Sequence, residues 1–209
     1  MNPNAPSRCE CCLRPARYCL CALVPHISTC IQLLVIQHPS EHRHALNTAR
    51  LLVAGVAGAH LLITETLAEG SPWYNLLADP GWQTEILFPG TGVPVVGAAV
   101  ELARPRRLVL LDGTWRKARK LLHLNPLLQR LPKVALPEGL QSRYRLRKAP
   151  QPGALSTLEA GVEALQRIEP ATDFSPLLKP FEALIDGQIQ AMGQARYQAN
   201  YQRLAQKPT

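Results

Sequence analysis

Two short apolar runs constrain the fold of this 209-residue chain more than any other feature of its sequence. Residues 31–37 form an apolar stretch that ends at His38-Pro39, and residues 106–111 run directly into Asp112-Gly113. A strand that is apolar throughout, rather than at every second residue, is buried on both faces, as strands of parallel sheets are. We therefore expect both runs to be strands in the interior of a sheet.

Helical patterns alternate with these runs and with weaker strand candidates. We expect further strands at residues 59–64, 85–88, 133–136 and 144–147, and helices at residues 45–56, 72–77, 114–123 and 176–201. Another helix opens at Ser156, which forms a capping-box pattern with Glu159, and Thr114 can cap the helix that follows it. Such alternation predicts an α/β fold with a mostly parallel sheet flanked by helices.

The hydropathy pattern predicts a cytoplasmic protein. No apolar run reaches the roughly 18–20 residues that cross a bilayer. The first seven residues are polar and do not have the pattern of a signal peptide. We expect no membrane contact, and nothing in the sequence indicates an obligate protein partner.

Five of the six cysteines fall within residues 9–21. Cytosolic thiols stay reduced, so this cluster favours a metal site over disulfides. Four thiolates complete the tetrahedral coordination of Zn²⁺, with an iron–sulfur cluster as a less favoured alternative. Cys11 could compete for one position, and Cys30 is expected to be a small buried residue. We expect residues 1–28 to form a zinc-binding segment and residues 29–209 the main domain. The expected ligands are Cys9, Cys12, Cys19 and Cys21.

Positive charge is concentrated in one part of the chain, which has a net charge of +8. Residues 104–148 contain thirteen Lys or Arg residues and two acidic residues, whereas the rest contains ten basic and thirteen acidic residues. Such localised charge favours a polyanionic partner, RNA or DNA, over a basic face that contacts only solvent.

The junction at Asp112-Gly113-Thr114-Trp115 has the features of a ligand site. Ligands of open parallel sheets bind beyond the carboxyl ends of the strands. Gly113 permits close approach of the backbone, Trp115 offers a stacking plane, and Asp112 places a carboxylate among cations. The alternative is an ordinary Asp-Gly turn followed by a tryptophan in the core.

This junction resembles the Asp-x-Thr-Trp signature of the DTW-domain family. The cysteine array is similar to the family's zinc-binding segment. Further blocks match in the same order, although Phe88 stands where the family often has tyrosine and Gly90 replaces a small polar residue. They are His38-Pro39-Ser40-Glu41, Asn47-Thr48-Ala49, Leu87-Phe88-Pro89-Gly90 and Leu155-Ser156-Thr157-Leu158-Glu159-Ala160.

The resemblance implies an enzyme that transfers the 3-amino-3-carboxypropyl group of S-adenosylmethionine to N3 of a uridine in tRNA and releases methylthioadenosine. The family's compact bacterial members modify the variable-loop uridine. The resemblance also implies a fold similar to that of the SPOUT methyltransferases, with a trefoil knot near the C-terminus, so that residues 29–209 would be the catalytic domain.

The resemblance further implies which residues form the site. Asp112 would act as the general base for N3 or as an electrostatic partner of the donor, and Trp115 would line the pocket or stack on a base. His38 and Glu41 would contact RNA or fix their loop. The expected cofactor contacts are Leu87, Phe88, Pro89, Gly90, Leu111, Asp112, Gly113, Thr114, Trp115, Leu155, Ser156 and Thr157. The expected RNA contacts are His38, Glu41, Arg116, Lys117, Arg119, Lys120, Arg143, Arg145, Arg147 and Lys148.

Two other functions compete with this one. A tRNA methyltransferase of the same fold type would release S-adenosylhomocysteine, and a non-enzymatic zinc-containing RNA-binding protein would consume no donor. A phosphate-binding NTPase is disfavoured because the chain lacks a G-x4-G-K-[ST] loop.

Overall fold

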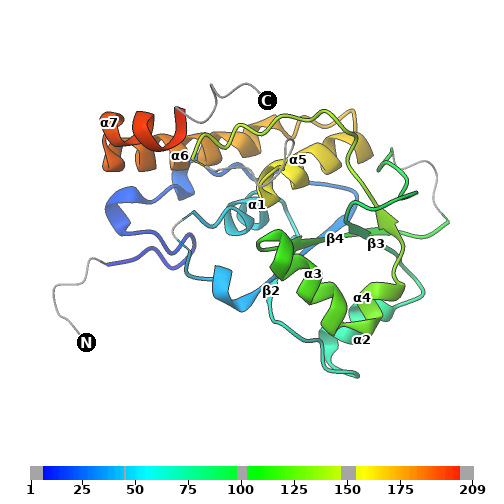
Figure 1. The fold of residues 1–209 in the computed structure, drawn as a ribbon. Coiled ribbons are helices and arrows are strands. Elements are labelled where there is room, and N and C mark those ends of the chain that lie inside the picture. The colour runs from blue at the N-terminus through cyan, green and yellow to red at the C-terminus, as the bar shows by residue number, and fades with distance from the viewer. Residues whose placement is uncertain (1–6, 45, 98–102, 147–153, 203–209) are drawn as a thin grey trace.

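The computed structural model describes residues 7–44, 46–97, 103–146 and 154–202 (Figure 1). The strands are β1 (Gln32–Gln37), β2 (His60–Ile63), β3 (Gln83–Leu87), β4 (Arg106–Asp112) and β5 (Lys133–Val134). The α-helices are α1 (Ala49–Gly55), α2 (Pro72–Ala78), α3 (Trp115–Leu124), α4 (Pro126–Arg130), α5 (Thr157–Ile168), α6 (Leu178–Met192) and α7 (Gln194–Tyr197). Short helical turns are η1 (Ala16–Tyr18), η2 (Cys21–Leu23), η3 (Pro39–Glu41), η4 (Ser175–Leu177) and η5 (Gln198–Gln202). Among the described residues, no helix combines the length and apolar character that a membrane span requires.

The five strands form one parallel sheet in the order β2-β1-β4-β3-β5. β4 lies at its centre and pairs with β1 so that Gln37 lies beside Asp112. On the other side β4 pairs with β3, and Leu87 lies beside Leu110. The predicted α/β fold with a parallel sheet flanked by helices is therefore confirmed.

The apolar run of β1 is buried because both faces of the sheet are covered. Leu33 and Val35 belong to a core with α1, α5 and α6, whereas Leu34 and Ile36 belong to a core with α2, α3 and α4. Figure 1 shows these two helix groups on opposite sides of the sheet. None of the four side chains is exposed, and burial of each contributes about 1.5–3 kcal/mol.

The chain leaves β1 and β4 toward opposite faces of the sheet. α1 follows β1 and packs in the first core, while α3 follows β4 and packs in the second. Neighbouring parallel strands with diverging connections leave a crevice at their carboxyl ends, where α/β proteins bind ligands. Gln37 and Asp112 end these strands side by side and mark this edge of the sheet.

The predicted starts of α3 and α5 are confirmed by their hydrogen bonds, whereas the helix predicted at residues 45–56 begins only at Ala49. The Thr114 hydroxyl accepts from the backbone N–H of Lys117 and caps α3. Ser156 and Glu159 form the reciprocal capping box that begins α5. Both caps satisfy backbone donors that a helix leaves without internal partners.

The prediction of a strand at residues 144–147 is wrong over its described part, which forms a turn at Arg145 and Leu146. The backbone N–H of Tyr144 donates to the Ser142 hydroxyl, and that of Arg145 donates to the carbonyl of Arg143. Just before them, the N–H of Arg143 donates to the Glu159 carboxylate. Local and side-chain acceptors, rather than a neighbouring strand, therefore satisfy this backbone.

Two other predicted elements are shorter than expected. The strand predicted at residues 133–136 is β5, which ends at Val134 before Ala135 bridges to Val95. The helix predicted at residues 176–201 is interrupted at Gly193, whose φ of 86° is a conformation that glycine adopts readily.

Two arginines of the basic segment lie inside the protein. The Arg106 guanidinium donates to the Glu85 carboxylate at 2.7 Å. Arg107 donates to the Thr84 hydroxyl at 3.1 Å and stacks on Trp82 at 4.5 Å. Burial lowers the pKa of Arg107 from its ordinary value. Both arginines join strands at the amino end of the sheet, so they add little to a surface that could meet a polyanion.

Helix α5 packs closely on α1 at Gly161, and this contact predicts a change in stability. An alanine Cβ at Gly161 would lie 2.4 Å from Cδ2 of Leu52. We expect Gly161→Ala to destabilise the protein by about 1–3 kcal/mol in urea unfolding, because the core has no room for the methyl group.

The matched control for this prediction is Gly187→Ala in α6. A Cβ at Gly187 would meet no atom within 4 Å, so alanine should be neutral or stabilise the protein by about 0.5–1 kcal/mol. Equal effects of the two substitutions would contradict the close packing of α5 on α1.

Candidate active site

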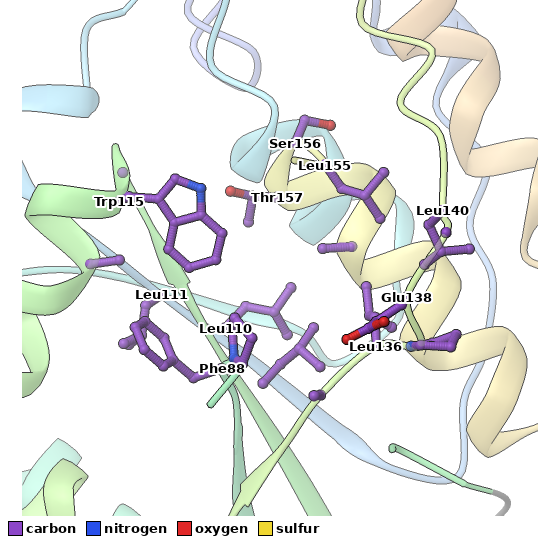
Figure 2. Close-up of a pocket in the computed structure, with 18 residues that line it drawn as sticks. Phe88, Leu110, Leu111, Trp115, Leu136, Glu138, Leu140, Leu155, Ser156 and Thr157 are labelled. Atoms are coloured by element: carbon purple, nitrogen blue, oxygen red, sulfur yellow. The ribbon is translucent and has the colours of Figure 1, made fainter. Parts of the chain in front are cut away.

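A cavity of about 560 Å³ lies at the carboxyl ends of β3, β4 and β5, between α3 and α5 (Figure 2). Phe88 and Trp115 meet edge to face on one side, with ring centroids 5.9 Å apart. Ser156 and Thr157, at the start of α5, form a second side, and residues 135–140 form the third. The volume lies within the ~300–1,000 Å³ typical of small-molecule sites.

The turn between β4 and α3 places Trp115 at this cavity. Gly113 adopts a φ of 155°, and a Cβ there would lie 3.0 Å from the Cβ of Lys117. Glycine is therefore required for the backbone to pass so close to α3. The Thr114 cap starts α3 at the next residue, so the first helical side chain, Trp115, faces the cavity.

Asp112 is buried, at 8% exposure, and its carboxylate joins two strands to α5. Oδ2 accepts a hydrogen bond of 2.7 Å from Nε2 of Gln37. Oδ1 accepts a hydrogen bond from the Thr157 hydroxyl. Since Thr157 also lines the cavity, its hydroxyl connects the cavity to the carboxylate.

The loop after β1 is tied to α3 by ion pairs. His38 Nε2 lies 2.8 Å from Oε1 of Glu65, and Lys120 Nζ lies 2.6 Å from the same oxygen. Hydrogen bonds from Lys120 and His38 lower the pKa of Glu65. Lys117 Nζ lies 2.6 Å from Oε1 of Glu41. In this structure His38 and Glu41 thus fix their loop against α3.

Most of the predicted cofactor residues meet at the cavity, from three separate parts of the chain. Gly90 follows the lining residue Pro89, and Asp112 and Thr114 flank the lining residue Gly113. That these residues bind a cofactor stays a prediction. The predicted residues that line the cavity are Leu87, Phe88, Pro89, Leu111, Gly113, Trp115, Leu155, Ser156 and Thr157.

Sequence analysis missed the wall of the cavity formed by residues 135–140. The signal for it was the weak strand predicted at residues 133–136. The carboxyl end of a parallel strand belongs to the same edge as the ends of β3 and β4, so the segment after it was a candidate. Other lining residues that were missed are Leu110, Ala118 and Ala160.

The predicted RNA contacts fall into distinct groups. Arg116 and Arg119 are exposed on α3 beside the cavity, and neither has an ion-pair partner among the described residues. Arg143 and Arg145 make exposed ion pairs with Glu182 and Asp186 of α6. Lys117 and Lys120 are paired with acids as described above. Arg147 and Lys148 lie outside the described residues.

Four cysteines near the N-terminus form a cluster that could hold a metal ion. Their Sγ atoms, from Cys9, Cys12, Cys19 and Cys21, all lie within 4.8 Å of one another. The Cys9–Cys21 and Cys12–Cys19 sulfurs are 3.6 and 3.8 Å apart. Zn–S bonds of about 2.3 Å in a tetrahedron separate sulfurs by about 3.8 Å, so the donors fit this ion.

The surroundings of the cluster shift its thiols in different directions. The backbone N–H groups of Cys12 and Cys11 lower the pKa of the Cys9 thiol to about 6, whereas burial and the neighbouring thiols raise the pKa of Cys21. Thiolates are the form that binds metal. Cys11 itself is exposed and outside the cluster. The prediction that Cys30 is buried is wrong, because its side chain is exposed where the chain enters β1.

Comparison with known proteins identifies the family. The family model described as the DTW domain matches residues 6–189. The chain belongs to the DTW-domain family. The family predicted from the motifs is therefore confirmed. No solved structure gives a significant match.

Three curated relatives of this DTW protein have related names. It is 30% identical to tRNA-uridine aminocarboxypropyltransferase 2 of Drosophila melanogaster, over 90% of this chain and 77% of the relative. It is 34% identical to the protein of the same name from Mus musculus, over 95% of this chain and 70% of the relative. It is 28% identical to tRNA-uridine aminocarboxypropyltransferase A of Arabidopsis thaliana, over 78% of this chain and 72% of the relative.

The cysteine cluster predicts the metal content of the protein. We expect Cys12→Ser to lose the metal measured by elemental mass spectrometry and to unfold at a lower temperature, because a structural metal site needs all four ligands. Cys11→Ser is the matched control and should retain the metal. Loss of metal in both variants would contradict the assignment of Cys11 to a position outside the cluster.

Proposed function

We propose that this DTW protein is a cytoplasmic tRNA-modifying transferase. It moves the 3-amino-3-carboxypropyl group of S-adenosylmethionine to N3 of a variable-loop uridine and releases methylthioadenosine. The observation that carries the proposal is the Asp112–Trp115 junction, which opens into a small-molecule cavity in a chain similar over most of its length to tRNA-uridine aminocarboxypropyltransferases.

The cavity suits S-adenosylmethionine in shape and polarity. Phe88 and Trp115 provide an aromatic wall for the adenine ring. The Ser156 hydroxyl and the backbone N–H of Thr157, at the N-terminus of the 12-residue helix α5, would donate hydrogen bonds to the carboxylate of S-adenosylmethionine. Glu138 adds a negative charge on the opposite wall, which suits a molecule that carries a sulfonium and an ammonium group.

Orientation in this cavity would decide the reaction. When bound, S-adenosylmethionine supplies an electrophilic carbon next to its sulfonium: attack at the γ-carbon leaves methylthioadenosine, and attack at the methyl group leaves S-adenosylhomocysteine. The task of the walls formed by Trp115, Thr157 and Glu138 is to present the γ-carbon to N3 of the uridine. Positioning of this kind accounts for a large share of enzymatic rate enhancement.

Thr157 and Asp112 provide a route for the N3 proton. The Thr157 hydroxyl faces the cavity and donates to Asp112. In the proposed step the Thr157 oxygen accepts the N3 proton while its own proton passes to the carboxylate. N3 forms a bond to the γ-carbon as the carbon–sulfur bond breaks. Asp112 is thus the general base, acting through Thr157.

The exposed arginines on α3 are proposed to contact the tRNA backbone. Arg116 and Arg119 lie one residue beyond Trp115 and Ala118, which line the cavity. The pairs of Arg143 and Arg145 with α6 are exposed and therefore weak, so phosphates could replace their partners. Arg147 and Lys148 belong to the same proposal.

Two further parts of the proposal concern the framework. The four-cysteine cluster would hold Zn²⁺ and stabilise the N-terminal segment, which has few apolar residues of its own. The SPOUT-like knot near the C-terminus and the division of the chain at residues 28 and 29 stay predictions from the family resemblance.

The proposed function is tested by incubating the purified protein with unmodified tRNA and S-adenosylmethionine. Mass spectrometry of the nucleosides should show an aminocarboxypropyl adduct on uridine, with methylthioadenosine released in equal amount. Release of S-adenosylhomocysteine would show a methyltransferase instead. Binding of tRNA without consumption of the donor would show a non-enzymatic RNA-binding protein.

Replacing Asp112 with Asn tests the role of its charge. Asparagine keeps the shape and can accept from Gln37 while its NH₂ group donates to Thr157, so the fold should persist. We expect turnover to fall by about 10²–10⁴-fold, the usual contribution of a general base, with partial recovery as rising pH ionises N3 directly. Thr157→Val should share the defect, and Thr157→Ser should retain activity. Full turnover by Asp112→Asn with donor binding intact would remove Asp112 from the mechanism.

Replacing Arg116 and Arg119 with Ala tests the RNA surface. We expect weaker tRNA binding and a log–log salt slope that is shallower by roughly 1–2, because two phosphate contacts are lost. The control removes the same charge from the exposed residues Arg17 of η1 and Arg196 of α7, away from α3, as Arg17→Ala with Arg196→Ala (Figure 1). An unchanged slope in the α3 variant would reject its contact with the backbone.

A further inference from the structure

We propose that Glu159 is a positioning residue that holds the outer wall of the cavity against the first turn of α5, and thereby sets the affinity for the donor. This inference rests on the proposed function. Glu159 does not line the cavity, and nothing in the proposed reaction requires its chemistry. Its importance follows from what its carboxylate joins.

The outer wall is the segment of residues 135–146. Its first half, residues 135–140, lines the cavity and runs beside α5, where Figure 2 shows Leu136, Glu138 and Leu140 in succession. No described helix or strand spans residues 135–146, so regular backbone pairing does not fix this wall beyond Ala135. Its position depends on side-chain contacts in its second half.

Glu159 supplies the buried polar contact of this wall. The side chain is 4% exposed. Oε1 accepts a 2.6 Å hydrogen bond from the backbone N–H of Arg143 and one of 3.1 Å from the Ser142 hydroxyl. Oε2 accepts a 2.8 Å hydrogen bond from the backbone N–H of Ser156. One carboxylate therefore fixes both the wall and the start of α5.

Leu146, at the far end of the wall, is buried in the core with α1, α5 and α6. The polar contacts other than that of Glu159 are weaker. The Arg143–Glu182 and Arg145–Asp186 pairs join side chains that are about half exposed, and such pairs typically contribute only about 0–1 kcal/mol. Tyr144 packs edge to face on Phe181, which holds the wall to α6 rather than to α5. Hydrogen bonds to a buried charged group are stronger, and leaving their donors unsatisfied is costly.

The first turn of α5 also connects the wall to the reaction centre. Ser156, whose N–H is held by Glu159, is followed by Thr157, whose hydroxyl donates to Asp112. A displacement of the Glu159 carboxylate would move the wall at residues 135–140 and the Ser156–Thr157 wall relative to each other. Donor binding needs both walls at once, whereas the arginines of α3 do not depend on this contact.

The test measures steady-state kinetics of Glu159→Gln and of the milder Ser142→Ala, which leaves the capping box intact. In Glu159→Gln an amide NH₂ group replaces one acceptor and opposes the N–H groups of Ser156 or Arg143. We expect the KM for S-adenosylmethionine to rise by roughly tenfold or more in Glu159→Gln and less in Ser142→Ala, as expected for weakened hydrogen bonds to a charged group. The KM for tRNA should stay close to that of the wild type.

Two control variants separate positioning from general destabilisation. Val162→Ala removes core packing from the same helix and leaves the hydrogen bonds of the wall in place, so it should lower the melting temperature and leave the KM for the donor unchanged. Glu182→Gln with Asp186→Asn removes the exposed ion pairs of the wall and should have little effect on this KM. Hydrogen exchange of residues 135–146 should accelerate in Glu159→Gln and stay unchanged in Val162→Ala.

The outcomes distinguish this inference from the proposed function. A wild-type protein that neither binds the donor in calorimetry nor modifies tRNA overturns both. A wild-type protein that modifies tRNA, together with a Glu159→Gln variant that keeps the wild-type KM for the donor, overturns only the role of Glu159. An equal rise of this KM in Val162→Ala would also overturn it, because stability alone would then explain the effect.

Discussion

The central position of β4, buried on both faces and paired on both edges, is the constraint on which the rest of the structure depends. Its pairing with β1 places Asp112 beside Gln37, and its pairing with β3 brings Leu110 beside Leu87. Since both neighbouring strands are parallel to β4, their carboxyl ends reach the same edge of the sheet. The cavity is the crevice at this edge, beyond the carboxyl ends of β3, β4 and β5.

Two buried carboxylates organise that crevice through the first turn of α5. Asp112 accepts from Thr157 on the side of the sheet, and Glu159 accepts from Ser156 and Arg143 on the side of the outer wall. The helix start is thus held at both sides by acceptors in a region with little solvent, where such hydrogen bonds are stronger than in water. The arrangement explains how a cavity whose outer wall has no regular secondary structure can keep a defined shape.

Over its described residues, 104–146, the basic segment of the chain does not form one basic surface. Arg106 and Arg107 lie between strands, and Lys117 and Lys120 are paired with acids from other loops. The exposed residues Arg116 and Arg119 on α3 stand beside the cavity. The net charge of the segment therefore overstates the charge that a nucleic acid could meet, and the position of the unpaired arginines relative to the cavity matters more than their number.

The strands of the sheet, the caps of α3 and α5, the four-cysteine cluster and the family could be predicted from the sequence, because they depend on local hydropathy, local hydrogen bonding and spacing along the chain. Features that depend on contacts between residues far apart in the chain became visible in the folded structure. It placed residues 135–140 in the cavity, exposed Cys30, and tied Ser142 and Arg143, which directly precede the strand wrongly predicted at residues 144–147, to Glu159. The strand prediction failed because local pattern does not reveal which acceptors satisfy the backbone N–H groups of a segment. For Arg143, at the start of this turn, the acceptor is a carboxylate on α5, 16 residues away along the chain and 2.6 Å away in space.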